Sequence, residues 1–169
     1  MNTIITTERL ILRPFEDNDF EAYKEMLQDE SVYKWLGDRK QRSDEQVLKM
    51  MQYFNHKSSS DGHGVYAVAL KSNNRLIGHA GTSFLKDLER TEYLYAFSKT
   101  HWGNGYATEI GQAYIPYYHK LTGDTTLIAI AYQGNLKSAH VLEKLGFVNK
   151  GEREVIGHTL DYFEFGRSS

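Results

Sequence analysis

The chain of 169 residues contains no cysteine and only two prolines. Without cysteine it can form no disulfide, no thiolate zinc site and no cysteine nucleophile. This composition fits a reducing compartment, so we expect a cytoplasmic protein. No apolar run approaches the roughly 20 residues that span a bilayer. The N-terminus also lacks an apolar stretch after a basic start, so neither a membrane span nor a signal peptide is expected.

Neither sign of charge is in large excess. Lys and Arg number 20 and Asp and Glu number 22, which gives a net charge of -2. A protein that binds nucleic acid or an anionic membrane usually carries a basic surplus, so neither partner is expected. The hydrophobic content of 40% and the charged content of 25% are ordinary for a globular protein. The length suits one domain over residues 1–169 with a substantial core.

Two glycines, Gly103 and Gly105, follow an apolar alternating run at residues 93–97 and precede a helix-like segment at residues 107–118. Glycine lets the backbone approach a ligand closely. A helix N-terminus supplies free N–H groups and roughly half a positive charge. A strand, a glycine turn and a helix in this order therefore predict a phosphate-bearing ligand. The alternative is a tight strand-to-helix turn that binds nothing.

The spacing of these glycines disagrees with two familiar phosphate motifs. A P-loop requires a Gly-Lys pair, which the chain lacks. The dinucleotide fingerprint requires a third small residue where this chain has Thr108. Its acidic partner should end the next strand, whereas the nearest candidate, Asp124, precedes that strand. NAD binding is therefore disfavoured, and a nucleotide-binding protein that converged on the glycine turn is the weaker alternative.

Three motifs together resemble a known family. Residues 7–15 read Thr-Glu-Arg-Leu-Ile-Leu-Arg-Pro-Phe, residues 102–109 read Trp-Gly-Asn-Gly-Tyr-Ala-Thr-Glu, and residues 135–147 read Asn-Leu-Lys-Ser-Ala-His-Val-Leu-Glu-Lys-Leu-Gly-Phe. In this order they resemble the GNAT superfamily of acetyl-CoA-dependent N-acetyltransferases. They are most similar to its RimJ/RimL branch, which acetylates protein amino termini. The resemblance extends from about residue 7 to residue 165.

The order of predicted elements matches the fold of that family. Hydrophobic periodicity predicts strands at residues 10–12, 65–71, 76–84, 92–97, 125–132, 147–150 and 159–165. Helices are predicted after a cap at Asp17 or Asn18, around residues 32–36, after the Ser43 capping box, from residue 107 and at residues 135–145. Residues 56–64 are predicted to form a mobile loop, and Pro116 to kink or shorten its helix. We expect an α/β (α+β) fold with a mixed, mostly antiparallel sheet of about six to seven strands, flanked by about four helices.

The resemblance implies where acetyl-CoA binds. The pyrophosphate loop corresponds to Trp102, Gly103, Asn104, Gly105, Tyr106 and Ala107, with Thr108 beside it. Trp102 replaces the Gln or Arg of the general family pattern, so phosphate binding would depend on backbone amides. The strand end from Tyr95 to Phe97 would offer backbone groups to the pantetheine arm, like an added strand. Asn135 matches the pantetheine-contacting asparagine, although it also suits a helix N-cap.

Direct acetyl transfer requires a base for the amine and a proton donor for the departing thiolate. In the family that this chain resembles, a tyrosine that protonates the thiolate occupies the position of Leu142. In one branch, a glutamate base occupies the position of Ile130. This chain therefore lacks both residues. Ser138 is the candidate proton donor, and its alternative is an ordinary helix serine. Glu92 is the candidate base, and its alternative is a solvated charge at a strand edge.

The acceptor pocket is predicted to lie among the first two helices, the 85–91 loop and the last hairpin. Its candidate lining residues are Trp35, Tyr93, Tyr132 and Tyr162. The histidines His79, His101 and His140 have no partner at metal-ligand spacing, so no metal site is predicted.

These residues and motifs are compatible with two functions of different classes. One is an acetyl-CoA-dependent N-acetyltransferase that acts on a protein N-terminus or a small-molecule amine. The other is a non-catalytic acyl-CoA sensor on the same fold, an alternative that the residues Leu142 and Ile130 keep open. A homodimer is an expectation from the family alone.

Overall fold

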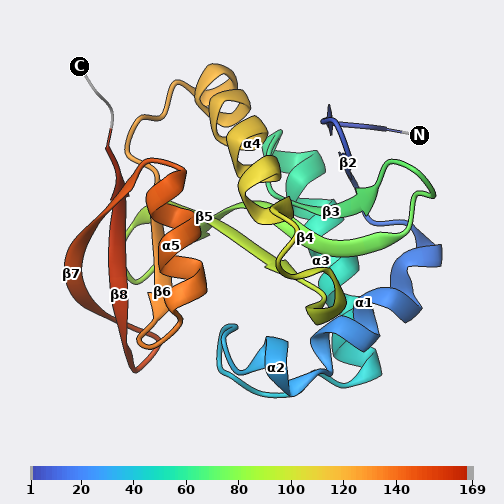
Figure 1. The fold of residues 1–169 in the computed structure, drawn as a ribbon, viewed down its shortest axis with the longest axis horizontal. Coiled ribbons are helices and arrows are strands. Elements are labelled where there is room, and N and C mark those ends of the chain that lie inside the picture. The colour runs from blue at the N-terminus through green and yellow to red at the C-terminus, as the bar shows by residue number, and fades with distance from the viewer. Residues whose placement is uncertain (1, 167–169) are drawn as a thin grey trace.

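The chain forms an eight-stranded sheet with helices on both faces (Figure 1). The structure is a computed structural model that describes residues 2–166. The strands are β1 (Ile5–Thr6), β2 (Leu10–Arg13), β3 (Val65–Leu70), β4 (Leu76–Leu85), β5 (Arg90–Phe97), β6 (Ile128–Tyr132), β7 (Phe147–Val155) and β8 (His158–Phe165). The helices are α1 (Phe20–Leu27), α2 (Glu30–Tyr33), α3 (Asp44–Asp61), α4 (Tyr106–Thr122) and α5 (Leu136–Lys144). The predicted fold class is confirmed. The described residues form eight strands and five α-helices, whereas six to seven strands and about four helices were expected.

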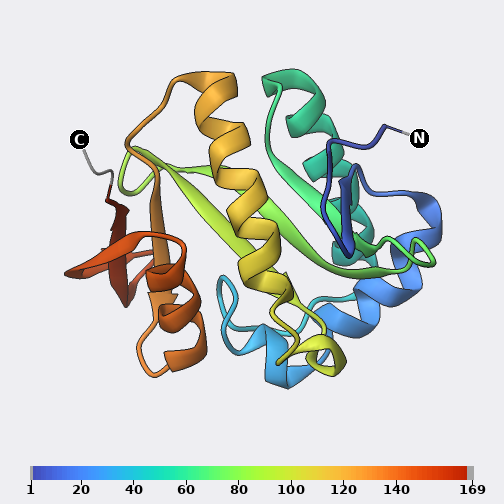
Figure 2. The same cartoon turned by 45° about the horizontal axis from the view of Figure 1, so that its top comes forward.

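Strand order within the sheet is β1-β2-β3-β4-β5-β6-β8-β7. Every neighbouring pair is antiparallel except β5 and β6, which run parallel. These two strands share a single register pair, between Glu92 and Ile128. Beyond Glu92 they diverge, as Figure 2 shows, so the β6-facing edge of β5 has no strand partner towards Phe97. The sheet is therefore split along its middle.

Two apolar clusters cover the two faces of the sheet. One cluster packs α4 and α5 against the sheet and includes Tyr93, Phe97 and Tyr114. The other packs α1, α2 and α3 against the opposite face and includes Tyr23 and Ala96. Successive side chains of a strand point to opposite faces. Alternate residues of β5 therefore face different helical layers.

A buried ion pair sets the start of the N-terminal helix. Arg13, at the end of β2, is fully buried and donates to both carboxylate oxygens of Asp19, at 2.8 and 2.9 Å. The backbone N–H of Glu16 also donates to Asp19, at 2.7 Å, and residues 17–19 form a 3-10 turn before α1. The predicted cap at Asp17 or Asn18 is therefore wrong, because Asp19 organises this turn.

The second helix is shorter than predicted. Asp29 caps α2 by accepting the backbone N–H of Ser31 at 2.9 Å. The helix ends after one turn, and Trp35 and Leu36 lie in the turns that follow it. Gly37 then adopts a positive φ of 47°, which redirects the chain towards the sheet.

Helix α3 confirms one prediction and overturns another. Ser43 and Gln46 form the predicted capping box, with both reciprocal hydrogen bonds present. The predicted mobile loop at residues 56–64 is wrong, because α3 continues to Asp61 and ends at the left-handed Gly62. Within this polar stretch Ser58 is buried, and its hydroxyl donates to the carbonyl of Asn55 at 3.2 Å. Tertiary burial here outweighs a polar, serine-rich sequence.

Helix α4 passes through Pro116 and continues to Thr122, so the predicted shortening is wrong. Its buried side is formed by Ile110, Gly111, Tyr114, Ile115 and Tyr118. Ala113 and Tyr117 are only partly buried. Across the described residues, no helix combines the length and the apolar character that a membrane crossing requires.

The C-terminal strands form one long hairpin rather than two short strands. β7 extends to Val155, well beyond the predicted end at Lys150, and its pairing with β8 shifts register between Asn149 and Glu152. β6 begins at Ile128, three residues later than predicted, because Asp124 accepts hydrogen bonds from Thr126 in the preceding turn.

Candidate functional site

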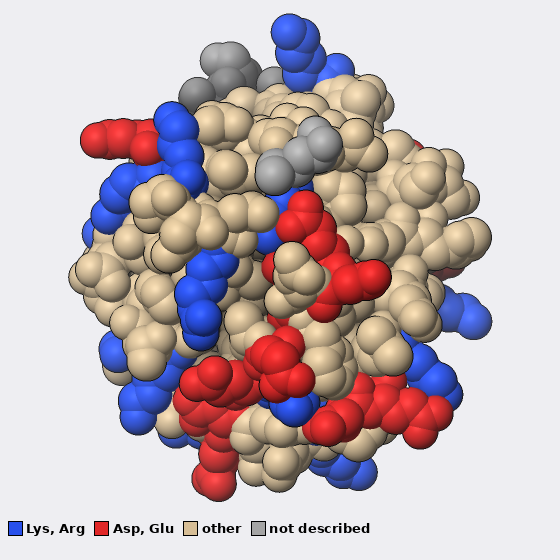
Figure 3. Space-filling view, turned by 90° about the vertical axis from the view of Figure 1, so that its right-hand side faces the viewer, with Lys and Arg blue, Asp and Glu red and all other residues tan. Residues whose placement is uncertain are grey.

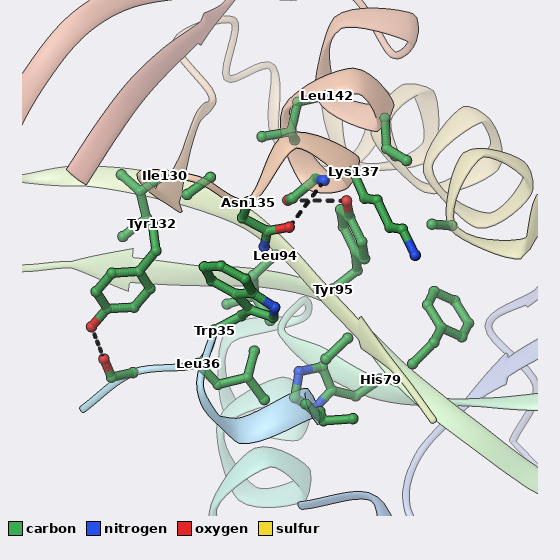
Figure 4. A pocket seen from close by; sticks show the side chains of 18 of the residues that line it. Trp35, Leu36, His79, Leu94, Tyr95, Ile130, Tyr132, Asn135, Lys137 and Leu142 are labelled. Carbon is green, nitrogen blue, oxygen red and sulfur yellow. Dashed lines mark hydrogen bonds between the residues drawn. The ribbon is translucent and has the colours of Figure 1, made fainter. Parts of the chain in front are cut away.

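A cavity of about 780 Å³ lies where β5 and β6 separate. Its lining residues come from β4, β5 and β6, from the segment between α2 and α3, and from the start of α4 and the length of α5. Figure 4 shows Trp35 and Tyr132 on one side of this space, and Asn135, Tyr95 and Lys137 on another. This volume is in the range of sites that hold cofactor-sized ligands.

The glycine turn predicted from the sequence forms one wall of the cavity. Gly103 and Gly105 have φ values of 80° and 79°, a left-handed conformation that other L-residues rarely adopt. Both glycines line the cavity together with Tyr106, Ala107 and Thr108. No side chain caps the N-terminus of α4, and the first backbone hydrogen bond there is from Glu109 to the carbonyl of Gly105. The preceding amides are therefore available to an anion.

Trp102 and Asn104 hold this turn in place. The indole N–H of Trp102 donates to the carbonyl of Phe97 at 2.8 Å, which ties the turn to the end of β5. Phe97 lines the cavity, and its carbonyl accepts this indole hydrogen bond. Asn104 does not line the cavity; its amide donates to the carbonyls of His101 and Trp102. Its side chain therefore stabilises the turn.

Cationic side chains lie beside the glycine turn. The ammonium of Lys137 is 5.3 Å from the centroid of the Trp102 ring, and both residues line the cavity. Arg9 stacks over the ring of Tyr106 at 4.4 Å and pairs with Glu109 at 2.7 Å. The sequence motifs did not single out Lys137, although it lies two residues after Asn135 and on the first turn of α5.

A hydrogen-bonded group at the N-terminus of α5 faces the same cavity. Asn135 caps this helix by accepting the backbone N–H of Ser138 at 3.3 Å, so its predicted capping role is confirmed. The hydroxyl of Tyr95 donates to the Oγ of Ser138 at 3.1 Å. Burial raises the pKa of Tyr95 to about 12, even though the Ser138 contact lowers it. Tyr95 is therefore a neutral donor that fixes the position of the serine oxygen.

Glu92 lies at the point where β5 and β6 part. Burial raises the pKa of its carboxyl from 4.5 to about 7. The interpretation as a solvated strand-edge charge is therefore wrong. Since side chains alternate along a strand, Glu92 and Ala96 project towards the layer of α1–α3, whereas Tyr95 projects towards α4 and α5. The carboxyl and the Tyr95–Ser138 pair thus lie on opposite faces of the sheet.

Two of the four predicted acceptor residues face the cavity as expected. Trp35 packs beside the apolar cluster that contains Tyr132, and both line the cavity. The hydroxyl of Tyr132 donates to the carbonyl of Gly37, which attaches the segment between α2 and α3 to the sheet. Arg39 stacks over the ring of Tyr132, with its guanidinium carbon 4.4 Å from the centroid.

The other two predicted acceptor residues are placed differently. Tyr93 borders the cavity, but its side chain is 2% exposed and packs against Tyr95, Tyr114 and Phe147 in the core. Tyr162 is not a lining residue; its hydroxyl donates to Glu164 at 2.9 Å. Alternation along β5 explains the first error, because Tyr93 and Glu92 are neighbours and cannot face the same side.

His79 lines the cavity and is buried with a hydrogen-bond partner. Its Nδ1 lies 2.6 Å from the hydroxyl of Tyr23, within hydrogen-bond distance. Burial lowers the pKa of His79 to about 4, so the ring is neutral at physiological pH. No charge is therefore placed at this wall.

The site fits a molecule that combines a phosphate group with an extended arm. Open space faces Gly103, because a Cβ built there would have no neighbour within 4 Å. Free helix amides and Lys137 suit the phosphates, and the unpaired edge of β5 suits an amide-bearing arm such as pantetheine. These residues agree with the predicted acetyl-CoA site.

Comparisons with known proteins agree with this geometry. A family model described as "Acetyltransferase (GNAT) domain" matches residues 9–148. The chain is 29% identical over 152 residues to the uncharacterized N-acetyltransferase YoaA of Bacillus subtilis (strain 168), covering 89% of this chain and 86% of YoaA. The structure of a GNAT-family acetyltransferase from Bacillus anthracis has a TM-score of 0.79 at 25% identity and covers 95% of both chains. A RimL ribosomal L7/L12 alpha-N-protein acetyltransferase in complex with coenzyme A shares the fold, with a TM-score of 0.79, 16% identity and coverage of 96% and 97%. This chain belongs to the GNAT family of acetyltransferases and uses acetyl-CoA as its co-substrate.

Proposed function

We propose that this enzyme transfers the acetyl group of acetyl-CoA to an amine by direct attack, with Glu92 as the general base. The observation that carries the proposal is a carboxyl with a pKa of about 7 at the opening between β5 and β6. A base whose pKa lies near the working pH is ionised often enough to accept a proton and basic enough to take it. Glu92, directly or through a water molecule, removes the proton of the acceptor ammonium.

Ser138 supplies a proton at the opening between β5 and β6, from the face of the sheet opposite Glu92. Because the Tyr95 hydroxyl donates to the Ser138 Oγ, the serine's own proton is free to point into the cavity. The departing thiolate of coenzyme A accepts that proton as Ser138 regains one from water, and Tyr95 acts as a positioning residue that stabilises the serine oxygen. This arrangement takes the place of the family tyrosine, since the corresponding position is the buried Leu142.

The acceptor is an amine of a protein N-terminus or of a small molecule, and we place the chain in the RimJ/RimL branch. Support for this branch comes from the opening motif at residues 7–15 and from the shared fold of the RimL structure. An α-amine has a reference pKa near 8, so a base such as Glu92 is well matched to it. A lysine-like amine, with a reference pKa near 10, would be a poorer match.

The cofactor part of the proposal is tested by a matched pair of glycine variants. Gly105 and Gly123 begin and end α4, both with positive φ, and neither has close backbone neighbours. Gly105→Glu and Gly123→Glu therefore impose similar backbone strain, but only the first adds a carboxylate to the phosphate site. Acetyl-CoA at 100 times its dissociation constant stabilises a protein by about 2.7 kcal/mol. We expect this thermal shift in the wild type and in Gly123→Glu, and its loss in Gly105→Glu.

The catalytic part is tested by Glu92→Gln in a thiol-release assay with a panel of amines. We expect kcat to fall by a factor of about 10²–10⁴ while acetyl-CoA binding stays intact. The ascending limb of kcat/KM near pH 7 should also disappear. If the wild type binds acetyl-CoA but acetylates no amine, the non-catalytic acyl-CoA sensor becomes the better description. Unchanged turnover in Glu92→Gln would refute the base role.

A further inference from the structure

The charges that line the cavity are unevenly distributed. Among the described residues, Glu92 is the one carboxylate in the lining, whereas Lys40, Arg42, Lys137 and Lys144 are cationic. The net charge of the chain is -2, so this basic lining is not a consequence of overall composition. Figure 3 shows carboxylates gathered on an outer face instead, on the side of α1 and the N-terminal strands.

The cationic residues of the cavity fall into two groups. Lys137 and Lys144 belong to α5, on the cofactor side of the cavity, and Lys137 lies beside the glycine turn, where the phosphates of acetyl-CoA account for it. Lys40 and Arg42 belong to the segment between α2 and α3, on the other side of the sheet, next to Trp35. The co-substrate does not explain this second group.

The second group also includes cations that do not line the cavity, and carboxylates neutralise only part of its charge. Arg42 pairs with Asp38 at 2.7 Å. Within residues 2–166, no ion pair with a carboxylate engages Lys34, Arg39 or Lys40. We call Lys34, Arg39, Lys40 and Arg42 the cationic rim.

Specific contacts hold the rim against the aromatic wall of the cavity. Arg39 has a positive φ of 64°, and its Nε donates to the carbonyl of Lys34 at 2.6 Å. Its guanidinium carbon lies 4.4 Å from the ring centroid of Tyr132 and 5.6 Å from that of Trp35. Lys34 approaches the Trp35 ring to 5.2 Å. Cations fixed in this way repel a polycationic substrate and attract an anionic one.

We propose that the acceptor is an amine that also carries an anionic group, a carboxylate or a phosphate. Its ammonium approaches Glu92, and its anionic group contacts the cationic rim. The apolar wall of Trp35, Tyr132 and Leu160 contacts the part of the molecule between them. This inference rests on the proposed amine acetyltransferase function. It predicts that amines with an anionic group are good substrates and that polycationic aminoglycosides are poor ones.

The first experiment measures kcat/KM at saturating acetyl-CoA for two series of acceptors. The peptide series is Ser-Glu-Glu-Phe amide with its Ser-Gln-Gln-Phe and Ser-Lys-Lys-Phe counterparts. The small-molecule series is phenylalanine, phenylalaninamide and ribostamycin. We expect the anionic member to be preferred over the neutral one by about five-fold or more in at least one series, and the cationic member to be the poorest. The series that shows the preference identifies the anion's source as a peptide or a small molecule.

A second experiment assigns the preference to the rim. In Lys40→Gln, the ratio of kcat/KM for the anionic over the neutral acceptor should fall about five-fold, the effect of one exposed charge pair. In Lys40→Glu the preference should reverse. Lys49→Gln, which removes an exposed charge from α3 outside the cavity, should leave the ratio unchanged. Raising the salt concentration should reduce the wild-type ratio through screening.

A binding measurement separates this inference from the proposed function. The N-acetylated forms of both series are titrated into protein saturated with coenzyme A. Selective binding of the anionic forms without any turnover would support the rim and refute the transferase mechanism. Turnover with equal or better use of neutral or cationic acceptors would overturn the rim and leave the mechanism standing. A ratio unaffected by Lys40→Glu would also overturn it.

Discussion

The raised pKa of Glu92 predicts that the candidate base destabilises the folded protein. Burial raises that pKa from 4.5 to about 7, so the folded state holds the proton more tightly than the unfolded chain. Below pH 4.5 both states are protonated and the group contributes nothing. As the pH rises from 4.5 to 7, the unfolded state ionises first and is favoured. One pKa unit corresponds to about 1.4 kcal/mol, so above pH 7 the cost is roughly 3 kcal/mol.

Glu92→Gln removes this cost, because glutamine does not ionise. We therefore expect the variant to be more stable than the wild type at pH 8 by roughly 3 kcal/mol, and close to equal at pH 4.5. For a protein of this length, the gain at pH 8 corresponds to an increase in Tm of about 6–12 °C. The same variant should lose activity, so stability and function would change in opposite directions.

The assay is urea unfolding of both proteins from pH 4.5 to 8, with the difference in unfolding free energy plotted against pH. Contributions of all other titrating groups are common to both proteins and cancel in this difference. Glu143→Gln, an exposed position on α5 outside the cavity, is the matched charge control. A flat curve for Glu92→Gln would refute the raised pKa and, with it, the argument for a base at this position.

Two further predictions concern other residues that line the cavity. Tyr95→Phe removes the hydroxyl that positions Ser138; kcat should fall about ten-fold with little change in acetyl-CoA affinity, and stopped-flow single turnovers should place the loss in the chemical step. An equal loss of affinity would instead indicate a binding role for Tyr95. Burial lowers the pKa of His79 from 6.5 to about 4. Above pH 6.5 the ring is neutral in both the folded and the unfolded state. As the pH falls towards 4, the unfolded state binds a proton first, so the folded state loses stability. Relative to His79→Gln, the wild type should lose roughly 3 kcal/mol of unfolding free energy over this range, and parallel curves would contradict the burial argument.

Much of the cofactor site could be predicted from the sequence because its determinants are local. Gly103 and Gly105 sit between a strand and a helix, and the left-handed turn that they form depends on the absence of a side chain rather than on distant contacts. The same holds for Asn135, whose capping bond to Ser138 spans three residues. In each case the spacing of the residues in the sequence is enough to predict the local geometry.

The errors arise where a side chain's neighbours are distant along the chain. Tyr93 looks like a cleft aromatic, but its side chain packs into the core on the face opposite Glu92. Residues 56–64 look like a loop, but burial of Ser58 extends α3 through them.

By itself, the sequence determined the fold family, the phosphate-binding turn and the capping of α5, because short-range spacing and backbone preference control these features. Only the tertiary structure decided the chemistry of the site. The single register pair between β5 and β6 opens the sheet at Glu92 and buries its carboxyl, which raises the pKa. The same opening places the Tyr95–Ser138 pair on one side and the cationic rim on the other. Burial and charge at this opening depend on segments that lie far apart along the chain, so no local pattern encodes them.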